Sequence, residues 1–313
     1  MNTQSFSLLV LGEALIDLVQ QDDGSYMPLL GGSPYNLCCA AAMQGVHAGY
    51  LNPFSTDTFG RSLQAQLIKS GAQSLSHPSP CPTSLSIVTI QNGEASYGFY
   101  REGVADRAYT INEVISILDS QPAGIFHSGS LMAMPPDHHI LLSLIEKAKS
   151  MGWIISLDIN ARPRLASDLN VYRDALRDIA QQADWLKASD EDLHFMGFEN
   201  VELANAGYIA NSFQNMGCSR IALSFGAKGA YLQVDDNAVS GAAPQVTVVD
   251  TIGAGDVFWA SCLADWVKSH PKKSDTGFLE QTLNRALSAS AIVCTRKGCA
   301  PPRLDEISTQ NSN

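Results

Sequence analysis

A glycine-rich turn directly before an apolar helix is the segment best suited to chemistry. Residues 250–256 read DTIGAGD and are followed by the apolar stretch VFWASCL. Small residues there leave backbone N–H groups uncovered at a helix N-terminus, where the helix dipole favours an anion. Asp256 could accept a proton from a hydroxyl nucleophile while nearby amides neutralise a transferred phosphoryl group. The alternative interpretation is an Asp that caps the helix.

The rest of the chain predicts the elements that position this turn. Short apolar runs alternate with longer amphipathic stretches, which is typical of strand–helix–strand units and a parallel sheet. We expect buried strands at residues 8–12, 124–127, 154–158, 185–188, 221–224 and 230–234. We expect helices at residues 34–44, 138–151, 171–183, 256–267 and 279–295.

Two segments, 17–30 and 84–109, do not follow this alternation of strands and helices, and their alternating side chains predict β-hairpins. Their turns are expected near residues 22–24 and at Asn92-Gly93, and an Asn-Gly pair between alternating residues is a strong hairpin signal. Such strands predict a small sheet that covers one end of the main domain as a lid. An edge extension of the main sheet is the alternative. We expect residues 1–313 to form a single domain with this lid inserted in it.

Composition and charge exclude several classes of function. The 313 residues are 45% hydrophobic and 16% charged, which is typical of a globular chain. The formal net charge of −11 argues against nucleic acid or an anionic membrane surface as a partner. Seven cysteines without a CxxC spacing predict buried, reduced thiols. No signal peptide or membrane span is recognisable near the N-terminus, so we expect a cytoplasmic protein.

Four segments, in the expected order, resemble the signatures of the ribokinase-like (PfkB) carbohydrate kinase family. DTIGAGD at 250–256 resembles its C-terminal signature, and GGSPYN at 31–36 resembles its N-terminal one. Residues 291–298 resemble the helix and loop that close the nucleotide site, and residues 224–229 resemble the strand and turn that precede it. The resemblance spans nearly the whole chain. It implies an α/β fold with three layers, α/β/α, a mainly parallel central sheet and a small β-sheet lid.

The resemblance also implies ATP-dependent phosphoryl transfer to a sugar hydroxyl. Asp256 corresponds to the catalytic base, and Gly253, Ala254 and Gly255 to the anion hole. The implied substrate-binding residues are Asp17, Gly31, Gly32, Asn36, Tyr100, Arg101, Asn160 and Arg162. Without the resemblance, Asp17 would be the start of a hairpin, and 31–34 an ordinary turn with a proline opening a helix. For each arginine the alternative is a surface ion pair.

The nucleotide and metal sites are implied in the same way. The implied ATP-binding residues are Lys187, Ser189, Ser224, Gly226, Gly229, Gly253, Gly255 and Gly298. The Asn-x-x-Glu element that organises water around magnesium in the family appears here as residues 189–192, so Asp192 is one methylene short. Glu191 could substitute, with Mg2+ contacted through water.

Asp250 and the 296–298 loop correspond to a region that binds a monovalent cation such as K+ in many relatives. Leu287 stands where many relatives carry an Asn or His near the adenine.

The identity of the sugar rests on weaker features. Residues 99–101, 105–106, 127–130 and 158–163 resemble fructokinases, which predicts fructose as the substrate. Kinases of 2-keto-3-deoxygluconate and aminoimidazole riboside share these elements, and ribose remains a further alternative. A catalytically silent sugar sensor or scaffold is the alternative of another class, which the presence of Asp256, Gly253 and Gly255 disfavours. The expected partners are the sugar and ATP, and a homodimer through the lid is possible.

Overall fold

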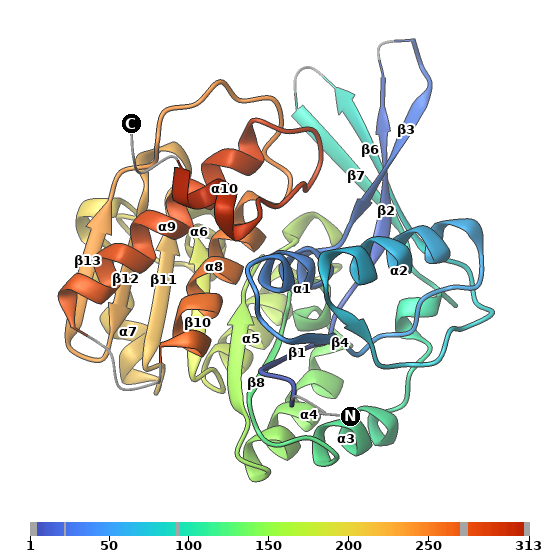
Figure 1. Cartoon of the computed structure of the whole chain (residues 1–313), viewed down its shortest axis with the longest axis horizontal. Coiled ribbons are helices and arrows are strands. Elements are labelled where there is room, and N and C mark those ends of the chain that lie inside the picture. The colour runs from blue at the N-terminus through green and yellow to red at the C-terminus, as the bar shows by residue number, and fades with distance from the viewer. Residues whose placement is uncertain (1–4, 22, 92–93, 270–274, 310–313) are drawn as a thin grey trace.

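A mostly parallel sheet forms the centre of the computed structural model, which describes residues 5–21, 23–91, 94–269 and 275–309 (Figure 1). Within these residues the sheet has nine strands in the order β13-β12-β11-β10-β9-β8-β1-β4-β5. Only the edge pairs β11/β12 and β12/β13 are antiparallel. The strands are β1 (Leu8–Val10), β4 (Ala48–Tyr50), β5 (Gln73–Ser74), β8 (Ile125–Gly129), β9 (Ile154–Asp158), β10 (Trp185–Ser189), β11 (Arg220–Ser224), β12 (Ala230–Val234) and β13 (Asn237–Gly241).

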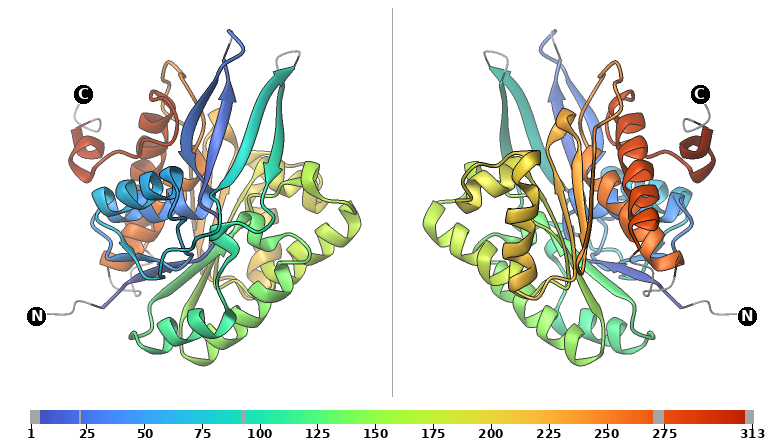
Figure 2. Two further views of the ribbon diagram at one scale, coloured as in Figure 1. Left: turned by 90° about the vertical axis from the view of Figure 1, so that its right-hand side faces the viewer. Right: turned by 90° about the vertical axis from the view of Figure 1, so that its left-hand side faces the viewer.

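Helices cover both faces of this sheet (Figure 2). On one face lie α1 (Ser33–Met43), α2 (Thr58–Ser70), α8 (Ala254–Lys268), α9 (Thr276–Cys294) and α10 (Leu304–Thr309). On the other lie α3 (Ile111–Asp119), α4 (His138–Ser150), α5 (Leu169–Ala180), α6 (Asp190–Met196) and α7 (Ala206–Asn215). Side chains alternate along a strand, so Leu8 and Val10 enter one core while Leu9 and Leu11 enter the other. The predicted three-layer arrangement is confirmed.

A separate small sheet projects from one end of the main sheet (Figure 1). It has the order β3-β2-β6-β7 and consists of β2 (Leu15–Gln20), β3 (Tyr26–Gly31), β6 (Ser84–Gln91) and β7 (Glu94–Tyr100). The parallel pair β2/β6 joins the two predicted hairpins. The hairpins are therefore not an edge extension of the main sheet. The predicted turn at 92–93 lies outside the described residues.

The order of the strands fixes where a ligand can bind. From β1 the chain moves outward to β4 and β5 and then returns to the opposite side of β1 with β8. This reversal opens a crevice at the carboxyl ends of the strands beside β1, where open α/β sheets bind ligands. The small sheet begins at this end, because β2 follows β1 after a short loop.

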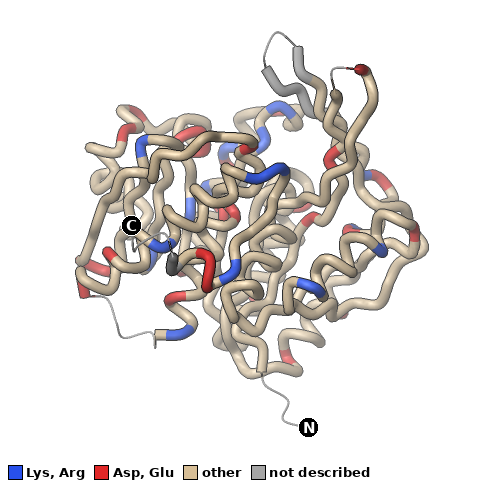
Figure 3. Tube along the Cα trace, turned by 45° about the horizontal axis from the view of Figure 1, so that its top comes forward, with Lys and Arg blue, Asp and Glu red and all other residues tan. Residues whose placement is uncertain are grey.

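Two further observations bear on possible partners. Among the described residues, no helix combines the length and apolar character that crossing a membrane requires. Lysines and arginines are dispersed over many elements (Figure 3).

Candidate active site

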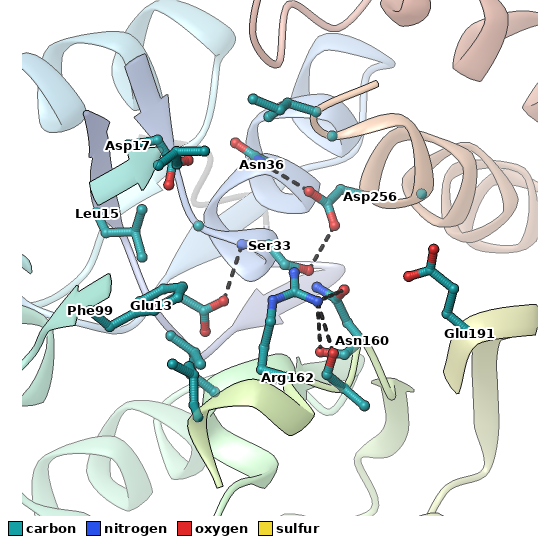
Figure 4. A pocket seen from close by; sticks show the side chains of 18 of the residues that line it. Glu13, Leu15, Asp17, Ser33, Asn36, Phe99, Asn160, Arg162, Glu191 and Asp256 are labelled. Atoms are coloured by element: carbon teal, nitrogen blue, oxygen red, sulfur yellow. Dashed lines mark hydrogen bonds between the residues drawn. The ribbon is translucent and has the colours of Figure 1, made fainter. Parts of the chain in front are cut away.

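The carboxyl ends of the central strands, the start of α8 and the small sheet enclose a cavity of about 550 Å³ (Figure 4). Its walls contain most of the predicted catalytic and substrate-binding residues. Those lining it are Asp17, Gly32, Asn36, Asn160, Arg162, Gly253, Gly255 and Asp256, together with Lys187, which was predicted to bind ATP, and Glu191, which was predicted to contact magnesium. Val88 and Phe99 of the small sheet close one side.

Asp256 stands in the first turn of α8, and both of its carboxylate oxygens are oriented by hydrogen bonds. The hydroxyl of Ser33 donates to Oδ1 at 2.7 Å, and the Asn36 amide nitrogen donates to Oδ2 at 2.9 Å. Burial raises the pKa of Asp256 above its ordinary value, although these two hydrogen bonds oppose the shift. The carboxylate is therefore a stronger base than an exposed Asp, and it is held in one orientation.

The turn before α8 requires glycine at Gly253. Its φ of 79° is in the left-handed region, and a Cβ there would lie 2.2 Å from Sγ of Cys299. Within the described residues, no side chain caps this end of the helix. The amide of Ala254 donates to the carbonyl of Thr251 at 3.2 Å, which closes the turn. An uncapped helix N-terminus facing a cavity is suited to bind an anionic group.

Lys187 places a positive charge behind this helix start. Its Nζ donates to both oxygens of Asp158, at 3.0 and 3.1 Å, and a Cβ on Gly255 would lie 3.1 Å from Nζ. Burial disfavours the ammonium form, but the carboxylates of Asp158 and Asp192 outweigh it and raise the pKa of Lys187. The lysine therefore stays charged beside the turn that is predicted to hold phosphate.

The paired glycines at the start of α1 allow the first loop to pack against the cavity wall. A Cβ on Gly31 would lie 2.4 Å from Oδ2 of Asp17. A Cβ on Gly32, whose φ is 109°, would lie 2.3 Å from the carbonyl oxygen of Glu13. The Asp17 carboxyl group thus lies over bare backbone, and burial raises its pKa. The structure thus brings together Asp17 and the glycine loop, which are both predicted to bind the substrate.

Asn160 and Arg162 follow β9 and line the cavity. Arg162 Nη1 donates to Oδ1 of Asn160 at 2.7 Å. Asn160 has a φ of 38°, an uncommon conformation for a residue other than glycine. Both side chains line the cavity beside Asp256 (Figure 4).

Arg101 and Tyr100 lie outside the lining of this cavity. Successive side chains of a strand point to opposite faces, so Phe99 lines the cavity while Tyr100, at 62% exposure, does not. Arg101 pairs with Asp106 at 3.0 Å, and their side chains are 12% and 2% exposed. Tyr100 and Arg101 line a second hollow of about 360 Å³. Arg101 thus forms a buried ion pair, which differs from the surface ion pair that was the alternative to substrate binding.

The two candidate magnesium carboxylates differ in their surroundings. Asp192 Oδ1 accepts the Ala161 amide at 2.7 Å, and its Oδ2 accepts the amide and hydroxyl of Ser189 at 2.7 and 2.8 Å. Ser189 and Asp192 thus form a capping box at the start of α6. Glu191 instead lines the cavity. No cluster of three His, Cys, Asp or Glu side chains in the described part of the chain could hold a metal by itself.

The remaining predicted nucleotide and cation residues lie at the outer loops and do not line the cavity. Ser224, Gly226 and Gly229 follow one another at the end of β11. Asp250 accepts the amides of Ile252 at 3.0 Å and Gly298 at 2.9 Å, and so joins the loop before α8 to the loop after α9.

Two buried polar residues of the cavity, Ser33 and Glu13, were not assigned a role from the sequence. Ser33, within the glycine loop, contacts Asp256 across 223 positions of the chain. Glu13 is 3% exposed and lines the cavity directly after β1. A carboxylate right after a buried apolar strand is a signal that could have identified Glu13, whereas the contact of Ser33 has no local signal.

Comparisons with known proteins identify the family of the chain. The pattern of the pfkB family carbohydrate kinases matches residues 5–306. A fructokinase of Rhizobium leguminosarum bv. trifolii is 32% identical over 267 residues, which cover 82% of this chain and 78% of that protein.

Solved structures show the same fold. Fructokinase from Vibrio cholerae O395, in a form with fructose, ADP and calcium ion bound, has a TM-score of 0.82 at 23% identity and covers 97% of this chain and 98% of its own. Aminoimidazole riboside kinase from Salmonella enterica, complexed with aminoimidazole riboside and an ATP analogue, has a TM-score of 0.80 at 23% identity, covering 96% and 98%. The predicted ribokinase-like fold is confirmed. With the family pattern extending over nearly the whole chain and its signature aspartate in the cavity, the chain belongs to the pfkB family of carbohydrate kinases.

Proposed function

We propose that this carbohydrate kinase is a fructokinase, which transfers the γ-phosphoryl group of ATP to a primary hydroxyl of fructose. The observation that carries the proposal is the buried Asp256, held by Ser33 and Asn36 at the N-terminus of α8. The curated relative that is 32% identical and named fructokinase supports fructose as the sugar.

The geometry of the cavity supports an in-line transfer. Asp256 accepts the proton of the attacking hydroxyl, the new O–P bond forms at the γ-phosphorus, and the bond to the leaving oxygen of ADP breaks. The uncapped start of α8 and the ammonium of Lys187 stabilise the negative charge on the transferring group. Asp17, Asn160 and Arg162 supply acceptors and donors for the other sugar hydroxyls.

Magnesium fits the nucleotide end of the cavity through Glu191. That carboxyl group lines the cavity, while both oxygens of Asp192 are already used by backbone and hydroxyl donors. A bound divalent cation neutralises phosphate charge during transfer.

We assign Ser189, Ser224, Gly226, Gly229 and Gly298 to the nucleotide, and Asp250 to ordering the loops that would surround a monovalent cation such as K+.

Dimerisation through the small sheet stays part of the proposal. β7 is an edge strand of that sheet, and Tyr100 at its end is 62% exposed. Light scattering of the purified protein would give the molecular mass and decide between monomer and dimer.

The proposal is tested by measuring ADP release with ATP, Mg2+ and K+ against fructose, ribose, 2-keto-3-deoxygluconate, adenosine, aminoimidazole riboside and no sugar. Turnover that is strongest with fructose is the expected result. Preference for aminoimidazole riboside, whose kinase has a TM-score of 0.80 with this chain, would keep the reaction and change the substrate. ATP binding without sugar-dependent ADP release would favour the sensor alternative.

A further inference from the structure

Glu13 is a buried charged residue of the cavity that the phosphoryl transfer leaves without a role. Its Oε1 accepts the amide of Ser33 at 3.2 Å. Its Oε2 has no hydrogen-bond partner within the described residues. An unpaired carboxylate oxygen at this depth is costly, and buried polar atoms in native structures usually have a partner. An unpaired oxygen in the wall of a binding cavity therefore indicates that the ligand supplies the missing donor.

The protein groups around Glu13 compensate its charge only in part. Burial raises the pKa of Glu13, and the charge of Arg101 and the side chain of Ser130 oppose this shift without reversing it. Arg101 Nη2 is directed to Asp106, at 3.0 Å. The neighbouring cavity wall contains the apolar side chains of Leu15 and Phe99. Figure 4 shows the Glu13 carboxyl group pointing into the cavity.

Ser33 separates Glu13 from the reacting end of the cavity. Its amide donates to Glu13, and its hydroxyl donates to Asp256 at 2.7 Å. The two carboxyl groups thus face the cavity from opposite sides of one residue (Figure 4). A hydroxyl bound by Glu13 is therefore not the hydroxyl that Asp256 deprotonates.

We propose that Oε2 of Glu13 accepts a hydrogen bond from a sugar hydroxyl that is not phosphorylated, and that Glu13 thereby selects a neutral polyol over a sugar acid. The inference rests on the proposed function and extends it to the substrate class. A sugar carboxylate next to Glu13 would meet a like charge in a buried site, which also contains Asp17 and Asp256. Of the cations in the same cavity, Lys187 is paired with Asp158, and Arg162 opposes the raised pKa of Glu13 without reversing it. A neutral hydroxyl meets no such repulsion.

The first test couples the removal of Glu13 with the removal of single hydroxyls. Wild type and Glu13→Ala are assayed with fructose and with analogues that each lack one hydroxyl that is not phosphorylated. For wild type, one analogue should lose about tenfold or more in kcat/KM relative to fructose. For Glu13→Ala, the same analogue and fructose should agree within about twofold. If Glu13 only supports Ser33, the variant slows every sugar alike and the wild-type ratio persists, which overturns the proposal.

Gln44→Ala is the matched control. Gln44 is likewise buried, and its side-chain oxygen has no hydrogen-bond partner in the described part of the chain, but Gln44 does not line the cavity. The control variant should keep the wild-type ratio between the analogue and fructose, even where its melting temperature falls. If the kcat/KM values for fructose and the analogue become similar in both variants, the effect comes from general destabilisation, which would contradict the role of Glu13.

The second test uses Glu13→Gln, which keeps the volume and an acceptor for the Ser33 amide but removes the charge. The ratio of kcat/KM for fructose to that for 2-keto-3-deoxygluconate should fall by about tenfold or more. An unchanged ratio overturns the selection against a sugar acid. This variant also keeps the proposal testable if Glu13→Ala fails to fold.

Failure of the proposed function is distinguishable from failure of this inference. If wild type does not phosphorylate fructose, the fructokinase assignment falls, and the hydroxyl series is repeated on the neutral sugar that it does phosphorylate. If wild type prefers 2-keto-3-deoxygluconate to every neutral sugar, both proposals fall. If fructose is phosphorylated but Glu13 shows no coupling to any hydroxyl, only the inference falls.

Discussion

Asp256 combines burial with two oriented hydrogen bonds, and both properties serve a base. Asp256→Asn should lower kcat by about 10²–10⁴-fold, because the proton of the attacking hydroxyl then has no acceptor. ATP affinity should stay close to wild type, since the amide side chain preserves the shape of the turn. Sugar-dependent ADP release and a nucleotide titration measure the two effects. Asp174→Asn, on the exposed face of α5, is the control, and full turnover by Asp256→Asn would refute the assignment.

Ser33 should set the pH at which this base is active. Its O–H bond stabilises the ionised form of Asp256, so removal of the hydroxyl raises a pKa that burial has already raised. Because the base works when ionised, activity is lost as pH falls through this pKa. Ser33→Ala should therefore move the acid limb of the kcat/KM profile to higher pH. Ser33→Thr, which keeps a hydroxyl, should restore the wild-type limb, and coincident profiles for Ser33→Ala and wild type would contradict the role.

The ion pair between Arg101 and Asp106 should matter for stability. Both side chains are largely buried, so Arg101→Ala leaves an uncompensated carboxylate and should lower the free energy of unfolding by about 3–5 kcal/mol. Arg177→Ala is the matched control. The side chains of Arg177 and its partner Asp174 are 50% and 70% exposed, so this pair should contribute about 1 kcal/mol or less to the free energy of unfolding. Denaturant titration of both variants measures the two losses in free energy of unfolding. Equal losses would show that the buried pair contributes no more to stability than the exposed pair.

Among the elements, the start of α8 depends on close packing against Cys299. Gly253→Ala adds a Cβ that would lie 2.2 Å from Sγ, in addition to the strain of a φ of 79°. Gly24→Ala, with a φ of 83° and nothing within 4 Å, is subject to the strain alone, about 1–2 kcal/mol. Gly253→Ala should therefore lower the melting temperature more than Gly24→Ala, and should also reduce turnover. Equal melting temperatures would show that the turn can move away from Cys299.

The elements also show what the sequence can and cannot predict. The strands at 154–158 and 230–234 have the predicted bounds, because strong apolar runs end there at polar or glycine residues. β4 and β5 were not predicted, because their sequences, AGY and QS, form no apolar run such as the LLV of β1. DTIGAGD predicted a glycine turn at the start of a helix, and the structure has one there, because this signal is local. The bond from the Ala161 amide to Asp192 and the pairing of Lys187 with Asp158 depend on neighbours from other strands and loops, which no local pattern specifies.

For the whole molecule, the small sheet should respond to ligands as a unit. Val88 and Phe99 line the cavity from this sheet, and a Cβ on Gly298 would lie 3.6 Å from Leu29 of β3. Sugar and nucleotide together should therefore slow amide hydrogen exchange in residues 84–91 and 94–100, since exclusion of water favours transfer over hydrolysis. Mass spectrometry of the exchanged protein measures this, with β12 as an internal reference. Unchanged exchange in the small sheet would argue against a lid.

The packing of α1 on α8 has a consequence for the synthesis of the chain. α1 is almost entirely apolar and buried, and α8, which covers it, lies more than 200 residues later in the sequence. A nascent chain that has reached only β13 therefore carries α1 with much of its apolar surface still exposed to water. The ribosome must add α8 before that surface is covered and before Asp256 meets Ser33. A chain that stops short of α8 should aggregate and should bind chaperones that recognise exposed apolar helices.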